Sequence, residues 1–451
     1  MAELVRNSHD DLQEKDLKFP DNPEAYAEHL HTFLREILEN QQLQEPRFTA
    51  MNWKVEQAHT AKALKLTKNN SATDMDGCPY ELWKNLEQRF ETDIAENKPA
   101  FDTVKVLTEI FRDIQESGVD PCTDFSLGWM CPIYKKKDPT EISNCHPMTL
   151  LNTDYKLLTK VLALQFIDYV HKLVHPDQTG FIPKRSIFDH IRLAKAIINY
   201  ADLLEENRAI IALDQEKAYD KIRHDYLWET LRAFKLPEPF IQTIRSLYEN
   251  AETLVALNGV FSSHFKVRCG VRQGDPLSCP IFNLAIEPLA CKIRSDPAIH
   301  GLRIPGLEEK LAIKMFADDT SLYLSQQDRF DHVQTIIDKW CAVSGAKFNI
   351  EKTEIIPIGA ENHRQRIITH RKLNPQDDHT FAKNIHIAQD GEAIRILGAW
   401  VGNGTNDMTP WEPVIDKINQ ILKKWNKLHP TLDGRKIIIQ AVIGRHTQFL
   451  T

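Results

Sequence analysis

Residues 311–324 read LAIKMFADDTSLYL, two short apolar runs separated by the acidic pair Asp318-Asp319. The runs 311–317 and 320–324 are rich in residues typical of strands, and a two-residue separation favours a tight β-hairpin. The sequence therefore predicts a hairpin with both aspartates at its tip. An Asp-Asp pair between strands is most often an ordinary turn when it stands alone, so its meaning depends on the rest of the chain.

A third carboxylate follows an apolar run upstream of this hairpin. Residues 209–213 read AIIAL, and Asp214 comes directly after them. A short continuous apolar run is typical of a buried strand, although an aspartate in this position could also be the N-cap of a helix. If this strand and the hairpin lie side by side, the three carboxylates meet at one point from separate elements.

Converging carboxylates suit the chemistry of divalent metal ions. Carboxylate oxygens are the ligands that Mg²⁺ prefers, and this ion keeps coordination positions for phosphate. Two ions about 3.5–4 Å apart can activate an attacking hydroxyl and hold a leaving oxygen, which is what nucleotidyl transfer needs. We therefore interpret Asp214, Asp318 and Asp319 as catalytic residues and metal ligands, with two Mg²⁺ ions as the expected cofactor and Mn²⁺ as a substitute.

The order of predicted elements after residue 208 fits a split sheet. The strand at 209–213 is followed by a short strand near 265–268 and by an apolar helix at 276–293, with Pro276 in its first turn. The hairpin, a helix at 327–343 and a strand at 354–358 complete the series. This order predicts an α+β fold with a β-α-β-β-α-β sheet whose helices cover one face.

Both ends of the chain are predicted to be helical, and their charges differ. Amphipathic helices are expected at 23–43 and 49–66, within a first hundred residues that hold 12 basic and 19 acidic side chains. Helices are expected again at 411–428 and from 434 onward, where residues 411–451 hold seven basic and three acidic side chains. The net charge of −7 therefore leaves room for a local basic surface that could contact phosphates, although such clusters are often only solvated helix faces. The last apolar pattern reaches Thr451 without a stop signal, so we expect a truncated chain.

The cysteines and the N-terminus exclude several classes of protein. The eight cysteines form no C-x-x-C pair, so no zinc spacing is present, and we expect reduced, mostly buried thiols in an intracellular protein. The first residues, MAELVRNSHDDLQEKD, lack the apolar stretch of a signal peptide. No run of 18 apolar residues occurs, so we expect no membrane span.

Several stretches resemble, in order, the motif boxes of reverse transcriptases. Phe316-Ala317-Asp318-Asp319 is similar to the F/Y-x-D-D box. The other matching stretches are DMDGCP (74–79), IYKKKD (133–138), TGF (179–181), ALDQEKAYD (212–220, motif A), GVRQGDPLS (270–278, motif B), FNIEKTE (348–354, motif D) and ILG (396–398, primer grip). The resemblance covers about residues 70–404, and the wording QEKAYD and GVRQGDPLS is typical of the non-LTR retrotransposon branch.

This resemblance implies a right-hand polymerase fold with fingers, a palm that contains the split sheet, and a partial helical thumb. The implied domains are a helical N-terminal extension with the start of the fingers (1–110), the reverse transcriptase domain (116–402) and an incomplete thumb (403–451). The implied function is an RNA-directed DNA polymerase that extends a primer 3′-hydroxyl with dNTPs on an RNA template by two-metal nucleotidyl transfer. The alternatives are a catalytically impaired retrotransposon remnant, an RNA- or DNA-binding module that retains the fold, or a DNA-templated or template-free nucleotidyltransferase on the same palm.

The resemblance also assigns roles to single residues. Asp214 and Asp318 would bridge the metals, with Asp319 as a weaker ligand. Tyr219 matches the family's sugar gate, whose ring leaves no room for a 2′-hydroxyl, although a core tyrosine is the alternative. The full set of nucleotide-binding candidates is Lys136, His146, Gln215, Tyr219, Gln273, Gly274 and Lys352. Among these, Lys352 could help to protonate pyrophosphate, or could be a plain surface lysine, and Trp411, Trp425 and the nearby lysines would form a thumb helix that tracks the template–primer backbone.

One position departs from the family's pattern. Family members carry an arginine before the proline that corresponds to Pro147, and this chain has His146 there. That arginine contacts the triphosphate, whereas a histidine is shorter and only partly cationic near neutral pH. The departure puts full polymerase activity in doubt.

Overall fold

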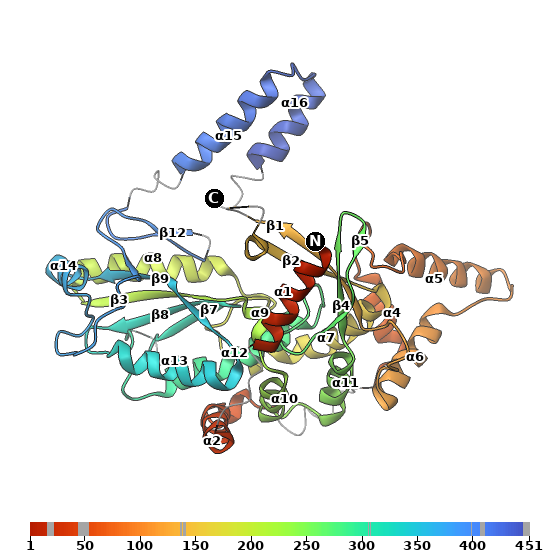
Figure 1. The fold of residues 1–451 in the computed structure, drawn as a ribbon, viewed down its shortest axis with the longest axis horizontal. Coiled ribbons are helices and arrows are strands. Elements are labelled where there is room, and N and C mark those ends of the chain that lie inside the picture. The colour runs from red at the N-terminus through yellow and green to blue at the C-terminus, as the bar shows by residue number, and fades with distance from the viewer. Residues whose placement is uncertain are drawn as a thin grey trace. The chain divides into compact units, whose positions relative to one another are not determined.

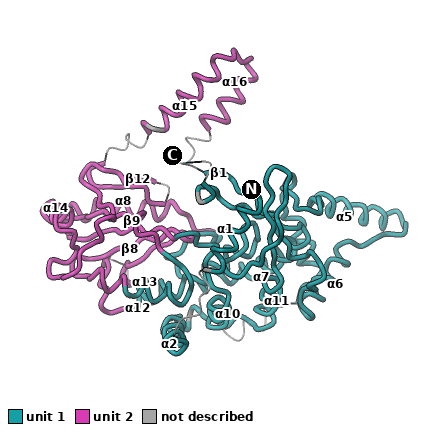
Figure 2. Tube along the Cα trace, viewed as in Figure 1, with its two compact units in different colours: residues 1–183, 216–295, 335–347 teal, residues 184–215, 296–334, 348–451 magenta. Residues whose placement is uncertain are grey.

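The computed structural model describes residues 1–15, 22–43, 54–135, 138, 141–304, 306, 308–397, 399–405 and 411–444. Helices and strands are mixed along the chain, so the predicted α+β class is confirmed (Figure 1). Two compact units are each assembled from separate stretches of sequence (Figure 2). Unit 1 holds residues 1–183, 216–295 and 335–347, and unit 2 holds 184–215, 296–334 and 348–451. The domain boundaries expected near residues 110 and 402 stay predictions.

Helices make up much of both units. Those of unit 1 are α1 (Ala2–Lys15), α2 (Pro23–Leu34), η1 (Glu39–Gln41), α4 (Gln57–Lys65), α5 (Tyr80–Ala95), α6 (Thr103–Ser117), η2 (Ile142–Asn144), α7 (Thr153–Leu173), α9 (Ala218–Lys221), α10 (His224–Ala233), α11 (Glu238–Glu249) and α12 (Ser278–Ser295). Those of unit 2 are α8 (Ile187–Leu204), α14 (Glu361–His370), α15 (Trp411–Asn426), α16 (Leu432–Ile439) and η3 (Gln440–Gly444). Helix α13 (Phe330–Ser344) begins in unit 2 and ends in unit 1. Over the described residues, no helix combines the length and the apolar composition that a membrane crossing requires.

The split sheet forms the centre of unit 2. Its strands are β3 (Arg208–Gln215), β7 (Ile313–Phe316), β8 (Asp319–Ser325), β9 (Phe348–Ile358) and β10 (His386–Ile387), in the spatial order β10-β9-β3-β8-β7. β3 pairs antiparallel with both β8 and β9, and β7 forms a hairpin with β8. The predicted β-α-β-β-α-β order is therefore present, with β10 added in parallel to β9. A separate hairpin joins β11 (Ile394–Ile396) to β12 (Ala399–Val401).

Burial of the split sheet is wider than the sequence predicted. On one face Ile210, Tyr323 and Ile356 pack in a core cluster that includes Ile197 and Ala201 of α8. The residues of the opposite face that alternate with them are just as deeply buried, namely Ile211, Leu322, Leu324 and Ile355. Both faces are therefore covered, not one. A shift of β3 by one residue would exchange its two faces, so this packing fixes the register of the strand.

Unit 1 contains a second sheet and the long buried helix α12. The sheet consists of β1 (Leu127–Tyr134), β2 (Cys145–Leu151), β4 (Glu252–Leu257), β5 (Val260–Phe261) and β6 (Phe265–Lys266). β1 is antiparallel to β2 and parallel to β4, and β4 pairs in addition with β5 and β6. Almost every residue of α12 from Ser278 to Ile293 is buried, as expected for a helix this apolar. The strand predicted at 265–268 is shorter than expected, because β6 holds only Phe265 and Lys266 and pairs with β4 alone in the described sheet.

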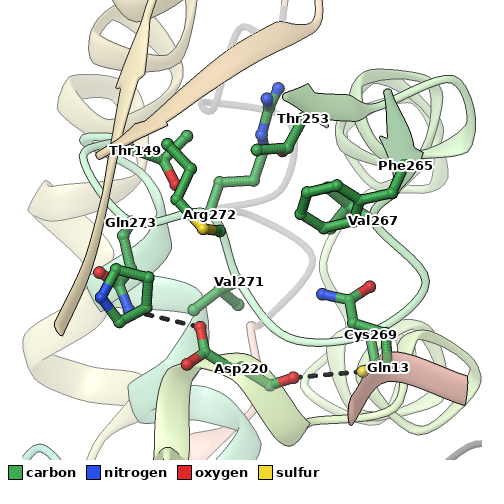
Figure 3. Close-up of a pocket in the computed structure, with 12 residues that line it drawn as sticks. Gln13, Thr149, Asp220, Thr253, Phe265, Val267, Cys269, Val271, Arg272 and Gln273 are labelled. Atoms are coloured by element: carbon green, nitrogen blue, oxygen red, sulfur yellow. Dashed lines mark hydrogen bonds between the residues drawn. The ribbon is translucent and has the colours of Figure 1, made fainter. Parts of the chain in front are cut away.

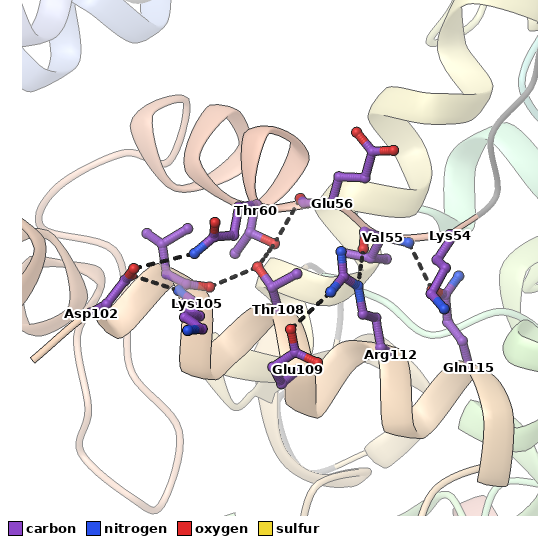
Figure 4. A network of polar contacts seen from close by, with 12 residues as sticks. Lys54, Val55, Glu56, Thr60, Asp102, Lys105, Thr108, Glu109, Arg112 and Gln115 are labelled. Carbon is purple, nitrogen blue, oxygen red and sulfur yellow. Dashed lines mark hydrogen bonds and ion pairs between the residues drawn. The ribbon is translucent and has the colours of Figure 1, made fainter.

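Side-chain hydrogen bonds join α4 to α6 near the start of the chain (Figure 4). The Thr108 hydroxyl donates to the Thr60 hydroxyl oxygen at 2.9 Å, and both residues are fully buried. Arg112 Nε donates to the carbonyl oxygen of Val55 at 2.7 Å, and the Val55 amide donates to Gln115 Oε1 at 2.8 Å. These bonds hold residues 54–65 against α6 within unit 1.

Several predicted boundaries are wrong for reasons that lie in tertiary contacts. The helix predicted at 23–43 ends at Leu34, because Ile37 and Leu43 are buried in turns and the Leu43 amide donates to the Phe234 carbonyl oxygen. The helix predicted at 49–66 begins at Gln57, and residues 44–53 lie outside the described residues. Helix α12 begins at Ser278, and Pro276 therefore precedes it, because Asp275 Oδ1 accepts the Leu277 amide in a capping turn.

The turn of the β7–β8 hairpin and the cysteines also differ from expectation. Phe316 pairs with Asp319, so the two-residue turn is Ala317-Asp318 and Asp319 is the first residue of β8. All eight cysteines are free, but only Cys269 and Cys291 are buried and Cys122 is exposed. The expectation of mostly buried thiols is therefore wrong.

Candidate active site

The three predicted aspartates lie at the same end of neighbouring strands in unit 2. Leu213 of β3 pairs with Thr320 of β8, so the next residue of β3, Asp214, adjoins the start of β8 at Asp319. Asp318 occupies the turn that precedes Asp319, where Ala317 has a φ of 55°. The β3–β9 ladder shifts register between Ala212 and Asp214, an irregularity of the kind that re-aims a side chain next to a functional site.

The charges of Asp214 and Asp318 affect the pKa of Asp319. The pKa of Asp319 is raised to about 6, because the surrounding protein desolvates its carboxylate and because Asp318 and Asp214 repel a further negative charge. Arg395 opposes this rise only in part. The residue as a whole keeps exposed surface, so the repulsion is the more informative of the two causes. The cluster holds negative charge that the described residues leave partly unbalanced.

A lysine shares this end of the sheet. Lys352 Nζ donates to Asp214 Oδ2 at 3.0 Å from within β9, and both side chains keep solvent contact. Lys352 was predicted to act near a triphosphate, and the structure places its ammonium beside the first of the predicted metal ligands. Its proposed role in proton transfer stays a prediction.

The aspartate cluster offers carboxylate oxygens to a metal ion. Among the residues that the structure describes, no group of three or more His, Cys, Asp or Glu side chains is arranged so that it could hold a metal ion. The chemistry of the donors nevertheless fits Mg²⁺, since neighbouring carboxylates that repel one another are the groups that a hard divalent cation stabilises. The fit therefore rests on charge and donor type.

Gln215 is not brought to the carboxylates. Neighbouring residues of a strand face opposite sides, so its side chain lies on the other face from that of Asp214. Gln215 is buried, and neither its amide nitrogen nor its amide oxygen has a hydrogen-bond partner in the described part of the chain. A role for it in nucleotide binding stays a prediction.

Tyr219 lies in unit 1, on the single-turn helix α9. Its ring stacks on Phe282 of α12, with ring centroids 4.5 Å apart and an interplanar angle of 20°. Its hydroxyl lies 3.8 Å from Cys279 Sγ. The stack holds the ring in one orientation, which a steric gate requires, although the same contact would also serve a core tyrosine.

The motif B loop is attached to α9 through the backbone. The Val271 amide donates to the Tyr219 carbonyl oxygen, and the Gly270 amide donates to that of Ile222, both at 2.6 Å. Gly270 has a φ of 80°, and a Cβ at this position would lie 2.7 Å from the carbonyl carbon of Asp220. Only glycine therefore permits this close approach.

Gln273 and Gly274 follow in the same loop. Gln273 Nε2 donates to Asp220 Oδ1 at 3.3 Å, as Figure 3 shows. Gly274 has a φ of 86°, and a Cβ there would lie 2.8 Å from the Thr149 carbonyl oxygen of β2. The sequence singled out both loop residues but gave no role to Asp220, although Asp220 stands inside the quoted motif A.

The charge of Arg272 in the motif B loop acts on Asp74 of the N-terminal box. Its guanidinium lies over the Tyr155 ring at 5.0 Å from the centroid, and Arg272 and Asp74 are both buried. Burial raises the pKa of Asp74 to about 6, while the charges of Arg272 and Lys156 lower it. The box at residues 74–79 is joined to α7, where the Thr153 hydroxyl donates to the Cys78 carbonyl oxygen at 2.9 Å.

The two candidates from the fingers motifs have different outcomes. His146 lies on β2 opposite Ile133 and is exposed, and its charge acts on the carboxylate of Asp220. Since neighbouring strand residues face opposite sides, its side chain lies on the other face of β2 from Pro147 and Thr149, which line a cavity with Asp220 and Gln273. Its contact with a nucleotide stays a prediction. Lys136 lies outside the described residues.

Comparisons with known proteins agree with the motif order. A family model described as reverse transcriptase (RNA-dependent DNA polymerase) matches residues 134–398. The uncharacterized 149 kDa protein of transposon TX1 from Xenopus laevis is 30% identical over 297 residues, which are 65% of this chain and 21% of that protein. The Pol polyprotein of the type-2 retrotransposable element R2DM from Drosophila melanogaster is 31% identical over 252 residues, 55% of this chain and 23% of that protein. The chain thus spans less than a quarter of the length of these two relatives.

The contact between Gly270 and α9 predicts a large effect of one methyl group. Gly270→Ala should destabilise the protein by about 1–3 kcal/mol beyond the strain of a positive φ, because its Cβ meets backbone that cannot move aside. Gly259→Ala is the matched control, since Gly259 has a similar φ of 78° with nothing within 4 Å of the added Cβ, and should cost only about 1–2 kcal/mol. Urea unfolding followed by tryptophan fluorescence measures both, and equal shifts would contradict the close approach.

Proposed function

Since the chain belongs to the reverse transcriptase family, we propose that it is an RNA-directed DNA polymerase that extends a primer 3′-hydroxyl with dNTPs on an RNA template. The observation that carries this proposal is the placement of Asp214, Asp318 and Asp319 at the ends of paired strands, where burial and the charges of Asp318 and Asp214 raise the pKa of Asp319. A cluster of this kind suits the binding of divalent cations and phosphates.

The residues of unit 2 supply the proposed chemistry. Asp214 and Asp318 would hold two Mg²⁺ ions, which Mn²⁺ could replace, and Asp319 would be a weaker ligand. When bound, the ions activate the primer hydroxyl and neutralise charge on the phosphates. Lys352 holds a proton beside Asp214 and would donate it to the leaving pyrophosphate.

The residues of unit 1 supply the proposed nucleotide contacts. The Tyr219 ring, fixed by its stack on Phe282, would exclude a 2′-hydroxyl. Gln273 and Gly274 would contact the incoming nucleotide and the template strand, and the backbone of Gly274 permits close approach. The basic face of α15, with Lys417, Lys423 and Lys424, would track the template–primer backbone.

The biological setting is proposed from the relatives. The matching relatives are named as products of transposons and retrotransposable elements. One of them is named the RNA-directed DNA polymerase from the mobile element jockey of Drosophila funebris, and it is 23% identical over 62% of this chain. We therefore place this chain as the polymerase portion of a non-LTR retrotransposon protein. His146 favours a second candidate, a catalytically impaired remnant that retains the fold, because histidine replaces the arginine of the family's fingers box.

Primer extension tests the proposed activity. On poly(rA)/oligo(dT) with Mg²⁺ or Mn²⁺ we expect the chain to incorporate dTTP, and Asp318→Asn should lower the rate by about 100-fold or more, because a charged metal ligand is lost. Duplex binding, measured by fluorescence anisotropy, should change little. Asp378→Asn removes an exposed carboxylate of the same unit and serves as the control. Duplex binding without extension in either metal would favour the impaired remnant.

The sugar gate predicts a change in substrate selection. Tyr219→Ala should raise incorporation of rNTP relative to dNTP by about 10-fold or more, because loss of the ring opens space below the sugar. Tyr219→Phe keeps the stack on Phe282 and should keep the discrimination. The measurement is kcat/KM for rUTP and dTTP with each variant, and unchanged selectivity in the alanine variant would make Tyr219 a structural residue.

His146 predicts weak nucleotide binding that arginine would repair. An arginine can form a forked, charge-assisted contact with phosphate, and one such hydrogen bond is worth about 1.5–3 kcal/mol, or about 10–150-fold. His146→Arg should therefore lower the KM for dTTP by about 10-fold or more with little change in duplex binding. If KM stays the same, His146 does not face the triphosphate.

A further inference from the structure

We infer that Asp220 fixes the orientation of the Gln273 side-chain amide, and so determines which hydrogen bond Gln273 offers to the nucleic acid or nucleotide. This inference rests on the proposed function and adds a positioning residue to it. Asp220 stands directly after the proposed sugar gate Tyr219, so one turn of helix would control two nucleotide contacts.

The first support is the contact itself. Gln273 Nε2 donates to Asp220 Oδ1 at 3.3 Å, and Figure 3 shows the two side chains pointing toward one another across the loop. Both residues line a small cavity of about 40 Å³, together with Pro147, Thr149 and Val271. The carboxylate of Asp220 is therefore held beside the motif B loop.

The second support is the rigidity of the surroundings. The peptide that carries Asp220 is bonded to motif B through the Val271 and Gly270 amides, and Cys269 Sγ donates to the Asp220 carbonyl oxygen at 3.2 Å. These bonds hold the backbone of Asp220 beside motif B, so only the rotation of its short side chain remains free. A fixed acceptor of this kind can hold a flexible amide in one orientation.

The third support is the chemistry of the two groups. A glutamine amide has a donor end and an acceptor end that differ little in shape, whereas an ionised carboxylate only accepts. Burial raises the pKa of Asp220, and the charges of Lys217, His146 and Lys221 together with the hydrogen bond from Gln273 offset only part of that rise. The hydrogen bond that Gln273 donates itself favours the ionised carboxylate, so the acceptor role of Asp220 and the donor role of Gln273 support each other. Asp220 therefore selects the donor end of Gln273 and leaves the acceptor end free to point elsewhere.

The acceptor end of the Gln273 amide, Oε1, is available to a ligand as far as the described residues are concerned. Gln273 Oε1 is buried and has no hydrogen-bond partner among the residues that the structure describes. A buried acceptor without a partner costs free energy unless a donor satisfies it. The expected ligand group is thus a hydrogen-bond donor, either a hydroxyl of a sugar or an amino group of a base.

A swap of the two groups tests this inference without catalysis. The probe is dTTP, titrated with Mg²⁺ into the full chain bound to an RNA template and a DNA primer that ends in a dideoxynucleotide, so that no bond can form. Resistance of the complex to a competitor duplex reports the Kd for dTTP. Gln273→Glu should raise this Kd by about 10-fold or more, because two carboxylates then face each other. Asp220→Asn should raise it by about 2-fold or more, because both amide orientations become populated.

The double variant is decisive. In Asp220→Asn/Gln273→Glu the polarity is reversed: the new amide donates to the new carboxylate, and an acceptor oxygen still faces the ligand. Its Kd should return to within about 3-fold of the wild-type value, since the pair is restored as a unit. A merely structural role would make the double variant as weak as the product of the two single variants, and that result would overturn the inference.

Two further measurements separate the possible failures. Asp225→Asn removes a carboxylate from the same segment that is paired with Arg223 at 2.7 Å, and it should leave the Kd for dTTP unchanged. If the wild type binds dTTP but extends no primer, the proposed polymerase activity fails while the Kd values still decide the role of Asp220. If the wild type captures no dTTP at all, both proposals are wrong.

Discussion

The register of β3 between β8 and β9 is the constraint on which the candidate site depends. Ile210 and Ile211 are buried on opposite faces of this strand, so a slip by one residue would exchange the side chains that pack into the two faces. The same register brings Asp214 next to the start of β8, where Asp318 and Asp319 follow the turn. Ordinary core packing therefore places three carboxylates together, and burial and the charges of its two neighbours raise the pKa of Asp319.

The motif B loop in unit 1 depends on backbone contact. Gly270 permits two short hydrogen bonds to the peptides around α9, which no residue with a Cβ would allow. The loop and the turn that carries Tyr219 and Asp220 therefore form one rigid piece. Rigid support of this kind matters for nucleotide selection, because a contact that is loose by about 1 Å discriminates poorly.

The sequence predicted the parts whose signals are local. The strand before Asp214 and the split-sheet order follow from alternation and run length, and the structure confirms them, whereas the predicted hairpin is present with its turn one residue earlier, at Ala317-Asp318. The end of α2 at Leu34, the pairing of Gln273 with Asp220, and the effect of the Arg272 charge on the pKa of Asp74 were not predicted, since each depends on residues far apart in sequence. The division into two units was also hidden, because each unit is assembled from separate stretches. Asp220 could have been noticed, since it lies inside motif A beside the proposed gate.

Helix α1 shows how distant residues complete the support of motif B. Gln13 Oε1 accepts the Arg268 amide at 2.5 Å, and Asp10 and Glu14 pair with the Arg268 guanidinium, just before the loop begins at Cys269. At the other end of the loop, buried Asp275 accepts the Leu277 amide and a hydrogen bond from the Tyr155 hydroxyl. With both ends held, the freedom that remains lies in the side chains between them. The orientation of the Gln273 amide is one such freedom, and an acceptor-only neighbour is the simplest group that can remove it.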